Sequence, residues 1–281
     1  MVEQLTDPIT YHGEGPVWSE RWGGLRWVDM LAGDVLSLRV DGSVTRRSVG
    51  AIIAALRPRR DGGAVIGVER GFMLESPEGS LIYLGDLWTS TDVRMNDGGC
   101  DPDGRFYCGS MAYDVEHGRG ALYRLDPDCS LQVVLQHVTI SNGIDWSPDG
   151  SLAYYVDTPT RRIDVFDYDD HAGLTRRRPF VSVPEDDGAP DGITVDADGG
   201  VWVALYGGGA VRRYTPVGVL DDVIDVPARQ VTACTFGGRR LDELYITTSR
   251  ENLDPHDDPL AGSLFRASIG VAGQPVREFA G

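Results

Sequence analysis

Residues 141–158 decide the fold and read Ser-Asn-Gly-Ile-Asp-Trp-Ser-Pro-Asp-Gly-Ser-Leu-Ala-Tyr-Tyr-Val-Asp-Thr. The stretch contains a turn at Ser147–Gly150, which is followed by a short β-type run at Leu152–Thr158. In a turn of this composition proline presets φ, aspartate bonds its own backbone, and glycine adopts φ > 0. The stretch is therefore typical of a tight hairpin between two short strands.

The same turn and run recur along the whole chain. Two further turns are closely similar, Asp-Pro-Asp-Gly at 101–104 and Asp-Ala-Asp-Gly at 196–199. Six β-type runs can be aligned, at residues 25–30, 64–69, 105–111, 152–158, 201–207 and 243–249. After most of them a short loop leads into a second alternating segment, so the repeat unit is an antiparallel meander.

The spacing of the runs predicts the architecture. A period of roughly 40 to 48 residues with about four short strands is typical of propeller blades, and six such repeats account for the 281 residues. No linker or low-complexity segment divides the chain, and a single blade cannot bury both of its faces. We therefore predict an all-β fold: a six-bladed β-propeller with about four antiparallel strands per blade, forming one domain over residues 1–281.

Composition excludes several function classes. The formal net charge of −17 disfavours nucleic-acid binding, because it repels phosphate backbones. All 26 basic residues are arginine, which excludes Schiff-base lysines and the P-loop lysine. The amino terminus lacks the pattern of an export signal, and no run approaches about eighteen apolar residues. We expect a soluble, cytoplasmic protein with no membrane partner, with small buried thiols at its four cysteines and with an oligomeric state that the sequence leaves open.

Polar residues recur in one register before the turns. Asn96, Asn142 and Asp191 each lie eight positions before a turn glycine, and Glu14 begins the first repeat with one extra residue. In a propeller, equivalent positions at the start of each innermost strand point at one end of the central channel. Two carboxylates that converge there repel each other, and a bound cation or a raised pKa relieves the repulsion. Oxygen ligands favour a hard ion, so we predict Ca²⁺, with Mg²⁺, Mn²⁺ or Zn²⁺ as alternatives.

Four ordered motifs carry a resemblance to a known family. They are Gly-Glu-Gly-Pro-Val-Trp at 13–18, Arg-Met-Asn-Asp-Gly at 94–98, Ser-Asn-Gly-Ile-Asp-Trp-Ser at 141–147 and Pro-Asp-Gly at 190–192. The chain resembles the senescence marker protein/gluconolactonase/luciferin-regenerating family, also called regucalcin-like, over nearly its entire length.

The resemblance implies a divalent-metal-dependent hydrolase of carboxylic esters, which opens gluconolactone-like sugar lactones to aldonic acids. By motif, Glu14, Asn142 and Asp191 would be the metal ligands, while Arg94 and Asn96 would hold the ring and hydroxyl oxygens of the substrate. Asp114 occupies the place where some animal members carry a substrate-contacting glutamate, and this departure leaves the sugar specificity open.

A mechanism follows as a hypothesis. The cation would polarise the lactone carbonyl and lower the pKa of a water molecule, from which Asp191 would take the proton as general base. Arg94 would place fixed positive charge near the developing oxyanion or the product carboxylate. His12 lies two residues before Glu14, which places it near the same channel mouth.

Several alternatives stay open. Arg94 could instead be a buried arginine paired with a carboxylate. The whole protein could be a non-catalytic propeller, in which the metal ties the blades together and another surface binds a ligand or protein partner. A third alternative keeps the hydrolase but changes the ester to an aryl lactone or an organophosphate.

Overall fold

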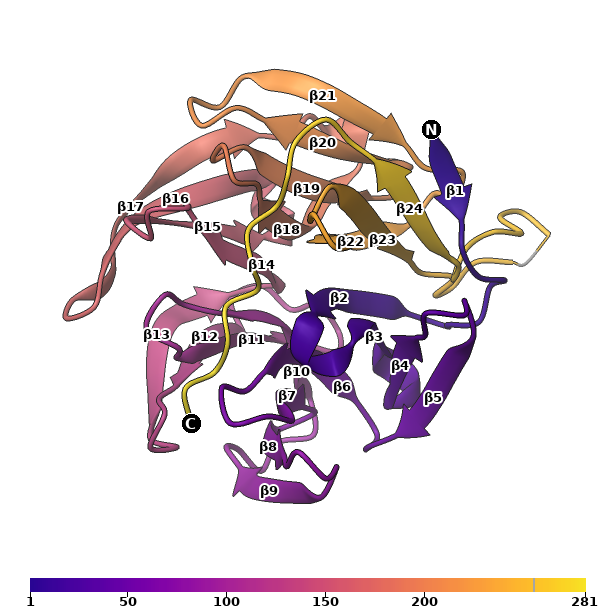
Figure 1. The fold of residues 1–281 in the computed structure, drawn as a ribbon. Helices are drawn as coiled ribbons and strands as arrows, with labels where there is room; N and C mark the ends of the chain where they lie inside the picture. Colours follow the sequence, from indigo (N-terminus) through magenta and orange to yellow (C-terminus); the bar gives the residue numbers. More distant parts are fainter. Residues whose placement is uncertain (255) are drawn as a thin grey trace.

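The computed structural model describes residues 1–254 and 256–281. These residues form six four-stranded antiparallel sheets, which are arranged around a central axis (Figure 1). The prediction of a six-bladed β-propeller with four antiparallel strands per blade is confirmed. Helical structure in this part of the chain consists of four short 3-10 turns, η1 (Glu20–Trp22), η2 (Met30–Ala32), η3 (Thr158–Thr160) and η4 (Glu185–Asp187). None of these helices is long and apolar enough to cross a membrane.

The first three blades each use four strands that follow one another in the chain. Blade 1 consists of β2 (Gly13–Ser19), β3 (Gly24–Asp29), β4 (Asp34–Leu38) and β5 (Val44–Ser48). Blade 2 consists of β6 (Ile53–Pro58), β7 (Ala64–Val68), β8 (Gly71–Glu75) and β9 (Leu81–Asp86). Blade 3 consists of β10 (Val93–Cys100), β11 (Phe106–Ala112), β12 (Gly120–Leu125) and β13 (Leu131–Val138).

Blades 4 and 5 follow the same order, and blade 6 combines both ends of the chain. Blade 4 consists of β14 (Ser141–Trp146), β15 (Leu152–Asp157), β16 (Arg162–Asp169) and β17 (Gly173–Ser182). Blade 5 consists of β18 (Ala189–Val195), β19 (Val201–Tyr206), β20 (Ala210–Tyr214) and β21 (Leu220–Asp225). Blade 6 consists of β22 (Val231–Gly237), β23 (Glu243–Thr248), β24 (Leu264–Ser268) and β1 (Val2–Gln4).

The amino-terminal strand closes the ring. β1 pairs with β24, so that Glu3 lies opposite Arg266 and the first strand becomes the outermost strand of the last blade (Figure 1). The innermost strands β2 and β22 also contact each other across the junction between the first and last blades. Main-chain hydrogen bonds and packing therefore both hold the two ends of the chain together.

The apolar core lies between neighbouring blades. Six clusters of buried side chains can be traced in the described residues, each shared by two adjacent blades. Trp27 of blade 1 shares a cluster with Tyr245 of blade 6, and Tyr107 of blade 3 packs edge-on against Trp146 of blade 4 at 5.3 Å between ring centroids. The described cysteines form no disulfide; three are buried as expected, but Cys129 is exposed. Burial between blades fixes the positions of the innermost strands, and these strands position the site.

A bulge in each innermost strand sets the direction of the channel-facing residues. The predicted turn glycines do adopt positive φ, at 85° for Gly104 and 72° for Gly150. Upstream of these turns the pairing register shifts between Met95 and Gly98 in β10, between Ser141 and Ile144 in β14, and between Pro190 and Ile193 in β18. Each shift brackets the polar residue of the predicted register. Because a bulge re-aims the side chain at its position, the repeat presents these polar groups to the axis.

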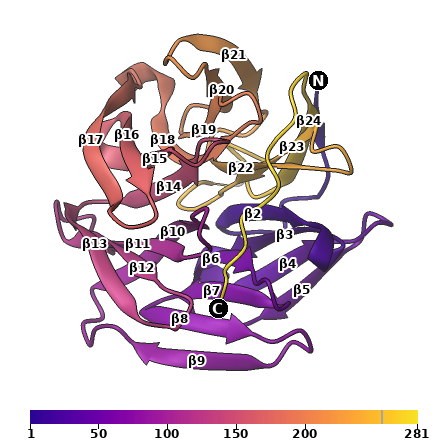
Figure 2. The same ribbon diagram turned by 60° about the vertical axis from the view of Figure 1, so that its left-hand side comes forward.

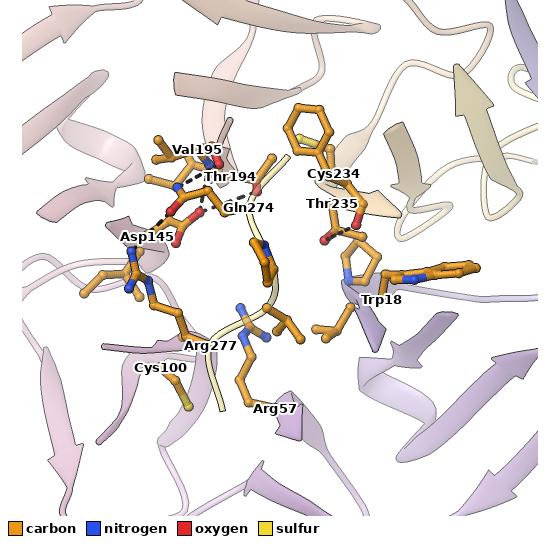
Figure 3. Close-up of a pocket in the computed structure, with 18 residues that line it drawn as sticks. Trp18, Arg57, Cys100, Asp145, Thr194, Val195, Cys234, Thr235, Gln274 and Arg277 are labelled. Atoms are coloured by element: carbon orange, nitrogen blue, oxygen red, sulfur yellow. Dashed lines mark hydrogen bonds between the residues drawn. The ribbon is translucent and has the colours of Figure 1, made fainter. Parts of the chain in front are cut away.

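The carboxyl-terminal segment, residues 271–281, crosses the end of the channel toward which the innermost strands run (Figures 1 and 2). The amide of Gln274 donates hydrogen bonds to the carbonyls of Trp146 and Val195, both at 3.0 Å. Figure 3 shows the small pocket of about 70 Å³ that remains at this end, with Arg57 and Asp145 among its lining residues. The segment therefore narrows this end of the channel.

Candidate active site

A cavity of about 510 Å³ lies at the end of the channel where the innermost strands begin. Five of the six candidate residues line it, and they come from four different blades: Glu14, Arg94, Asn96, Asn142 and Asp191. The structure therefore brings together residues that are up to 177 positions apart, from Glu14 to Asp191 (191 − 14).

The two candidate carboxylates, Glu14 and Asp191, are almost fully buried. Glu14 is 3% exposed and Asp191 5%; Oε2 of Glu14 accepts a hydrogen bond from the Gly15 amide at 2.9 Å. Oδ1 of Asp191 is buried and has no hydrogen-bond partner among the described residues. A buried carboxylate oxygen without a partner is costly, and such a group in a native fold is commonly explained by a ligand or an ion.

Both carboxylates hold their protons unusually tightly. Burial, and then the charge of Asp97, raises the pKa of Glu14 to about 8. Burial, and then the charge of Glu14, raises the pKa of Asp191 well above its usual range. Burial and the neighbouring carboxylates therefore outweigh the effect of Arg94, which lowers both pKa values.

A chain of hydrogen bonds joins the polar residues of blades 3, 4 and 5. Nδ2 of Asn96 donates to Oδ1 of Asn142 at 3.0 Å and to the carbonyl of Ser141 at 2.8 Å. Nδ2 of Asn142 donates to Thr158 Oγ1 at 2.8 Å, and this hydroxyl donates to the carbonyl of Pro190 at 2.9 Å. Both N–H groups of Asn96 are used within the protein, so its remaining capacity toward a substrate is as an acceptor through Oδ1.

Arg94 is buried without a carboxylate partner in the part of the chain that the structure describes. It is 6% exposed, and Nη1 donates to Oδ1 of Asn96 at 2.7 Å and to the carbonyl of Met95 at 3.0 Å. Its guanidinium lies 5.9 Å from the ring centroid of Tyr113, and burial lowers its pKa. Arg94 therefore does not form the structural pair with a carboxylate that was the alternative. Its Nη2 and Nε atoms carry no hydrogen bond within the described chain.

The donor set fits a divalent cation. The three candidate ligands that line the cavity, Glu14, Asp191 and Asn142, offer two carboxylates and one amide oxygen, an all-oxygen set of the kind that hard cations prefer. No group of three or more His, Cys, Asp or Glu side chains meets in a metal-binding arrangement within the described residues, and this set has only two such side chains. The unpartnered oxygen of Asp191 and the raised pKa of Glu14 are the features that a cation would relieve.

Asp114 does not line the cavity. Its side chain is 64% exposed, and Oδ2 lies 3.8 Å from Nη1 of Arg119. Its neighbours Tyr113 and Val115 line the cavity instead, because the backbone turns at Ala112 and Val115 adopts a φ of 59°. The resemblance placed a substrate contact at this position, and the structure places the side chain outside the cavity that the other candidates share.

Further polar residues line the cavity, among them His12, Tyr206 and Glu251. Burial, and then the charge of Arg94, lowers the pKa of His12 to about 3, so its imidazole is neutral. The sequence placed His12 near the mouth through its spacing from Glu14. Tyr206 is the last residue of β19 and Glu251 follows β23, and no repeated signal marks them.

Known proteins are similar to this chain over nearly its whole length. A family model described as "SMP-30/Gluconolactonase/LRE-like region" matches residues 12–250. A Bacillus subtilis protein named "Putative sugar lactone lactonase YvrE" is 36% identical over 279 residues, which cover 96% of this chain and 95% of that protein. Human regucalcin is 36% identical over 285 residues, with coverage of 96% and 95%.

A solved structure is similar over nearly the whole chain. The crystal structure described as that of a calcium-binding protein, regucalcin, from Agrobacterium tumefaciens has a TM-score of 0.91 and 29% identity, and the match covers 98% of this chain and 95% of that one. The motifs, the fold and these matches lead to one conclusion: the chain belongs to the SMP-30/gluconolactonase/LRE-like family.

Proposed function

We propose that this protein hydrolyses sugar lactones to aldonic acids and that Glu14, Asn142 and Asp191 hold a divalent cation for this reaction. The observation that carries the proposal is the buried Oδ1 of Asp191, which has no partner and shares a cavity with Glu14. Relatives named as a sugar lactone lactonase and as a calcium-binding protein support it. Ca²⁺ is the proposed ion, and Mg²⁺, Mn²⁺ and Zn²⁺ are the alternatives.

A divalent cation, when bound, supplies Lewis-acid polarisation of the lactone carbonyl and makes water easier to deprotonate near neutral pH. Asp191 acts as general base, and its carboxylate accepts the proton of the attacking water. Glu14, with one oxygen held by the Gly15 amide, supplies a fixed negative charge that orients the cation site.

Arg94 stabilises the negative charge that develops on the reacting carboxyl group. Its Nη1 is held by Asn96 and by the backbone, while Nη2 and Nε carry no hydrogen bond within the described chain. A guanidinium fixed in this way requires little rearrangement when the oxyanion forms or when the product carboxylate is bound. Asn96 positions both Arg94 and Asn142 through its hydrogen bonds.

Proton release from a panel of aldonolactones tests the proposal directly. Exhaustively chelated protein should lose turnover, and adding Ca²⁺, Mg²⁺, Mn²⁺ or Zn²⁺ in separate samples should restore it and rank the ions. Bound cation should also raise the melting temperature, because the ligands come together only in the folded state. Full lactonase rate in metal-free protein would refute the mechanism. Cation binding without turnover of any lactone would instead favour a non-catalytic, metal-stabilised propeller.

A further inference from the structure

The mechanism above leaves one buried polar side chain of the cavity unused. His12 is 7% exposed and lines the cavity beside Glu14. Its backbone is fixed on both sides, since its amide donates to Oδ1 of Asp29 at 3.0 Å and its carbonyl accepts from the Met30 amide at 2.9 Å. It also forms an isolated antiparallel bridge with Ser249. These contacts hold the imidazole in one place.

The hydrogen bonds around Ser249 assign the tautomer of His12. Oγ of Ser249 lies 2.8 Å from Nδ1 of His12. The same hydroxyl donates to the carbonyl of Tyr11 at 3.4 Å and accepts from the Glu251 amide at 3.0 Å. The hydroxyl thus has an acceptor other than His12, which leaves Oγ free to accept from Nδ1–H, and we assign the proton of the neutral imidazole to Nδ1. The carboxylate of Glu251, 3.5 Å from Nδ1, favours the same tautomer.

Nε2 of His12 is therefore an acceptor, and it is open to the cavity. No described residue forms a hydrogen bond to Nε2. The polar atoms of the described residues that lack both a partner and access to solvent do not include Nε2, so Nε2 has an accessible surface. Since the rest of the ring is buried, the cavity is where Nε2 finds its partner. A buried acceptor that remains unpaired costs free energy, so a ligand that donates to it is favoured over one that cannot.

We propose that His12 is a specificity-determining residue, whose Nε2 accepts a hydrogen bond from a hydroxyl group on the lactone ring. The inference rests on the proposed lactonase function and assigns to His12 the recognition of one hydroxyl group of the sugar lactone. A lactone that lacks the matching hydroxyl leaves Nε2 unpaired in a desolvated site. We expect at least a tenfold lower kcat/KM for that analogue.

Two substitutions separate the cavity contact from the structural contact. His12→Asn places an amide near the position of Nδ1, which preserves the contact with Ser249 but removes the acceptor from the cavity. His12→Gln extends an amide toward the position of Nε2, which preserves an acceptor in the cavity but gives up the bond to Ser249. A purely structural His12 predicts the opposite ranking of the two variants.

The experiment measures kcat/KM of the cation-saturated protein and both variants on glucono-1,5-lactone and its monodeoxy analogues. The parent should discriminate at least tenfold against one analogue, His12→Asn should reduce this ratio to within about twofold of unity, and His12→Gln should retain part of it. Cation titrations of each variant give a second readout.

Equal discrimination by the parent and His12→Asn for every analogue would overturn the inference and leave the lactonase function standing. A uniform loss of activity with weakened cation binding would also overturn it, because His12 would then be a ligand of the cation. A parent without lactonase activity would overturn both proposals.

Discussion

Nδ2 of Asn96 lies 3.0 Å from Oδ1 of Asn142, so two amides from the bulges of neighbouring blades orient each other. Asn142 is a proposed cation ligand, whereas Asn96 acts on the cation through it. Partners that orient a ligand typically change metal affinity by about 10- to 100-fold when they are removed. The arrangement of blades 3 and 4 is thereby linked to the strength of the proposed cation site.

Asn96→Ala should weaken cation binding by about 10- to 100-fold, since Asn142 loses the donor that fixes its amide oxygen. Isothermal titration with Ca²⁺ measures the change. Asn252→Gly is the matched control: Asn252 lines the same cavity outside this network, and its φ of 57° suits glycine. Unchanged affinity in Asn96→Ala would show that Asn142 is oriented without its neighbour.

Asp191→Asn should separate base from ligand. The amide keeps an oxygen for the cation but cannot accept the proton of water, so kcat should fall by on the order of 10² or more while the cation still binds. Glu14→Gln should chiefly weaken cation affinity, because it removes charge without removing the base. Lactone kinetics and calorimetry on both variants distinguish these effects. Equal losses of binding and turnover in Asp191→Asn would make Asp191 a ligand only.

Metal-free protein should lose stability as the pH rises. The pKa of Glu14 is raised from 4.5 to about 8 in the folded state, so the folded protein keeps a proton that the unfolded chain releases. This contribution is complete below about pH 4.5 and is lost as the pH rises through about 8. Thermal midpoints of chelated protein should fall between pH 5 and about pH 9, and Glu14→Gln should flatten the curve. Ca²⁺ should raise the thermal midpoint of the parent protein more at pH 8 than at pH 5. If the midpoints of the chelated parent and of Glu14→Gln changed in parallel with pH, the raised pKa of Glu14 would be contradicted.

Repetition explains what the sequence predicted and what it did not. The six blades and the convergence of Asn96, Asn142 and Asp191 follow from a turn that recurs at a constant distance from the channel-facing position. β1 has only three residues and no counterpart in the repeats, so the sequence did not indicate that the amino terminus closes blade 6.

The connections between the second and third strands within the blades lack such a register. Tyr206 ends β19 and Glu251 follows β23, and these connections differ in length between blades 5 and 6, so counting from a turn could not find the two residues. At Asp114 the local direction of the backbone decides where the side chain lies. The turn that follows Ala112 presents the residues on either side of Asp114 to the cavity and leaves Asp114 in solvent.

Arg94→Lys should lose most lactonase activity with little effect on folding. Lysine keeps the charge but lacks the planar guanidinium group. In the parent, Nη1 of this group is fixed by Asn96 and the Met95 carbonyl. Because Arg94 has no carboxylate partner within the described residues, its removal does not strand a buried anion in an ion pair. Lactone turnover and thermal midpoints for Arg94→Lys and Arg94→Ala measure the two effects. Normal turnover in both variants would remove Arg94 from the site.

The carboxyl-terminal segment should stabilise the propeller without taking part in its chemistry. Phe279 is fully buried in the cluster shared by blades 2 and 3, and its neighbours include Cys100 and Phe106. Phe279→Ala leaves a cavity there and should lower the free energy of unfolding by about 3 to 5 kcal/mol, measured by urea titration. Glu278→Ala is the control on the same segment; its ion pair with the half-exposed Arg21 is screened by solvent and should contribute little to stability. Below both melting temperatures and with saturating cation, kcat/KM of both variants should equal that of the parent, since neither residue lines the cavity that holds Glu14 and Asp191. A large loss of kcat/KM in folded Phe279→Ala protein would instead show that the two ends of the channel are coupled.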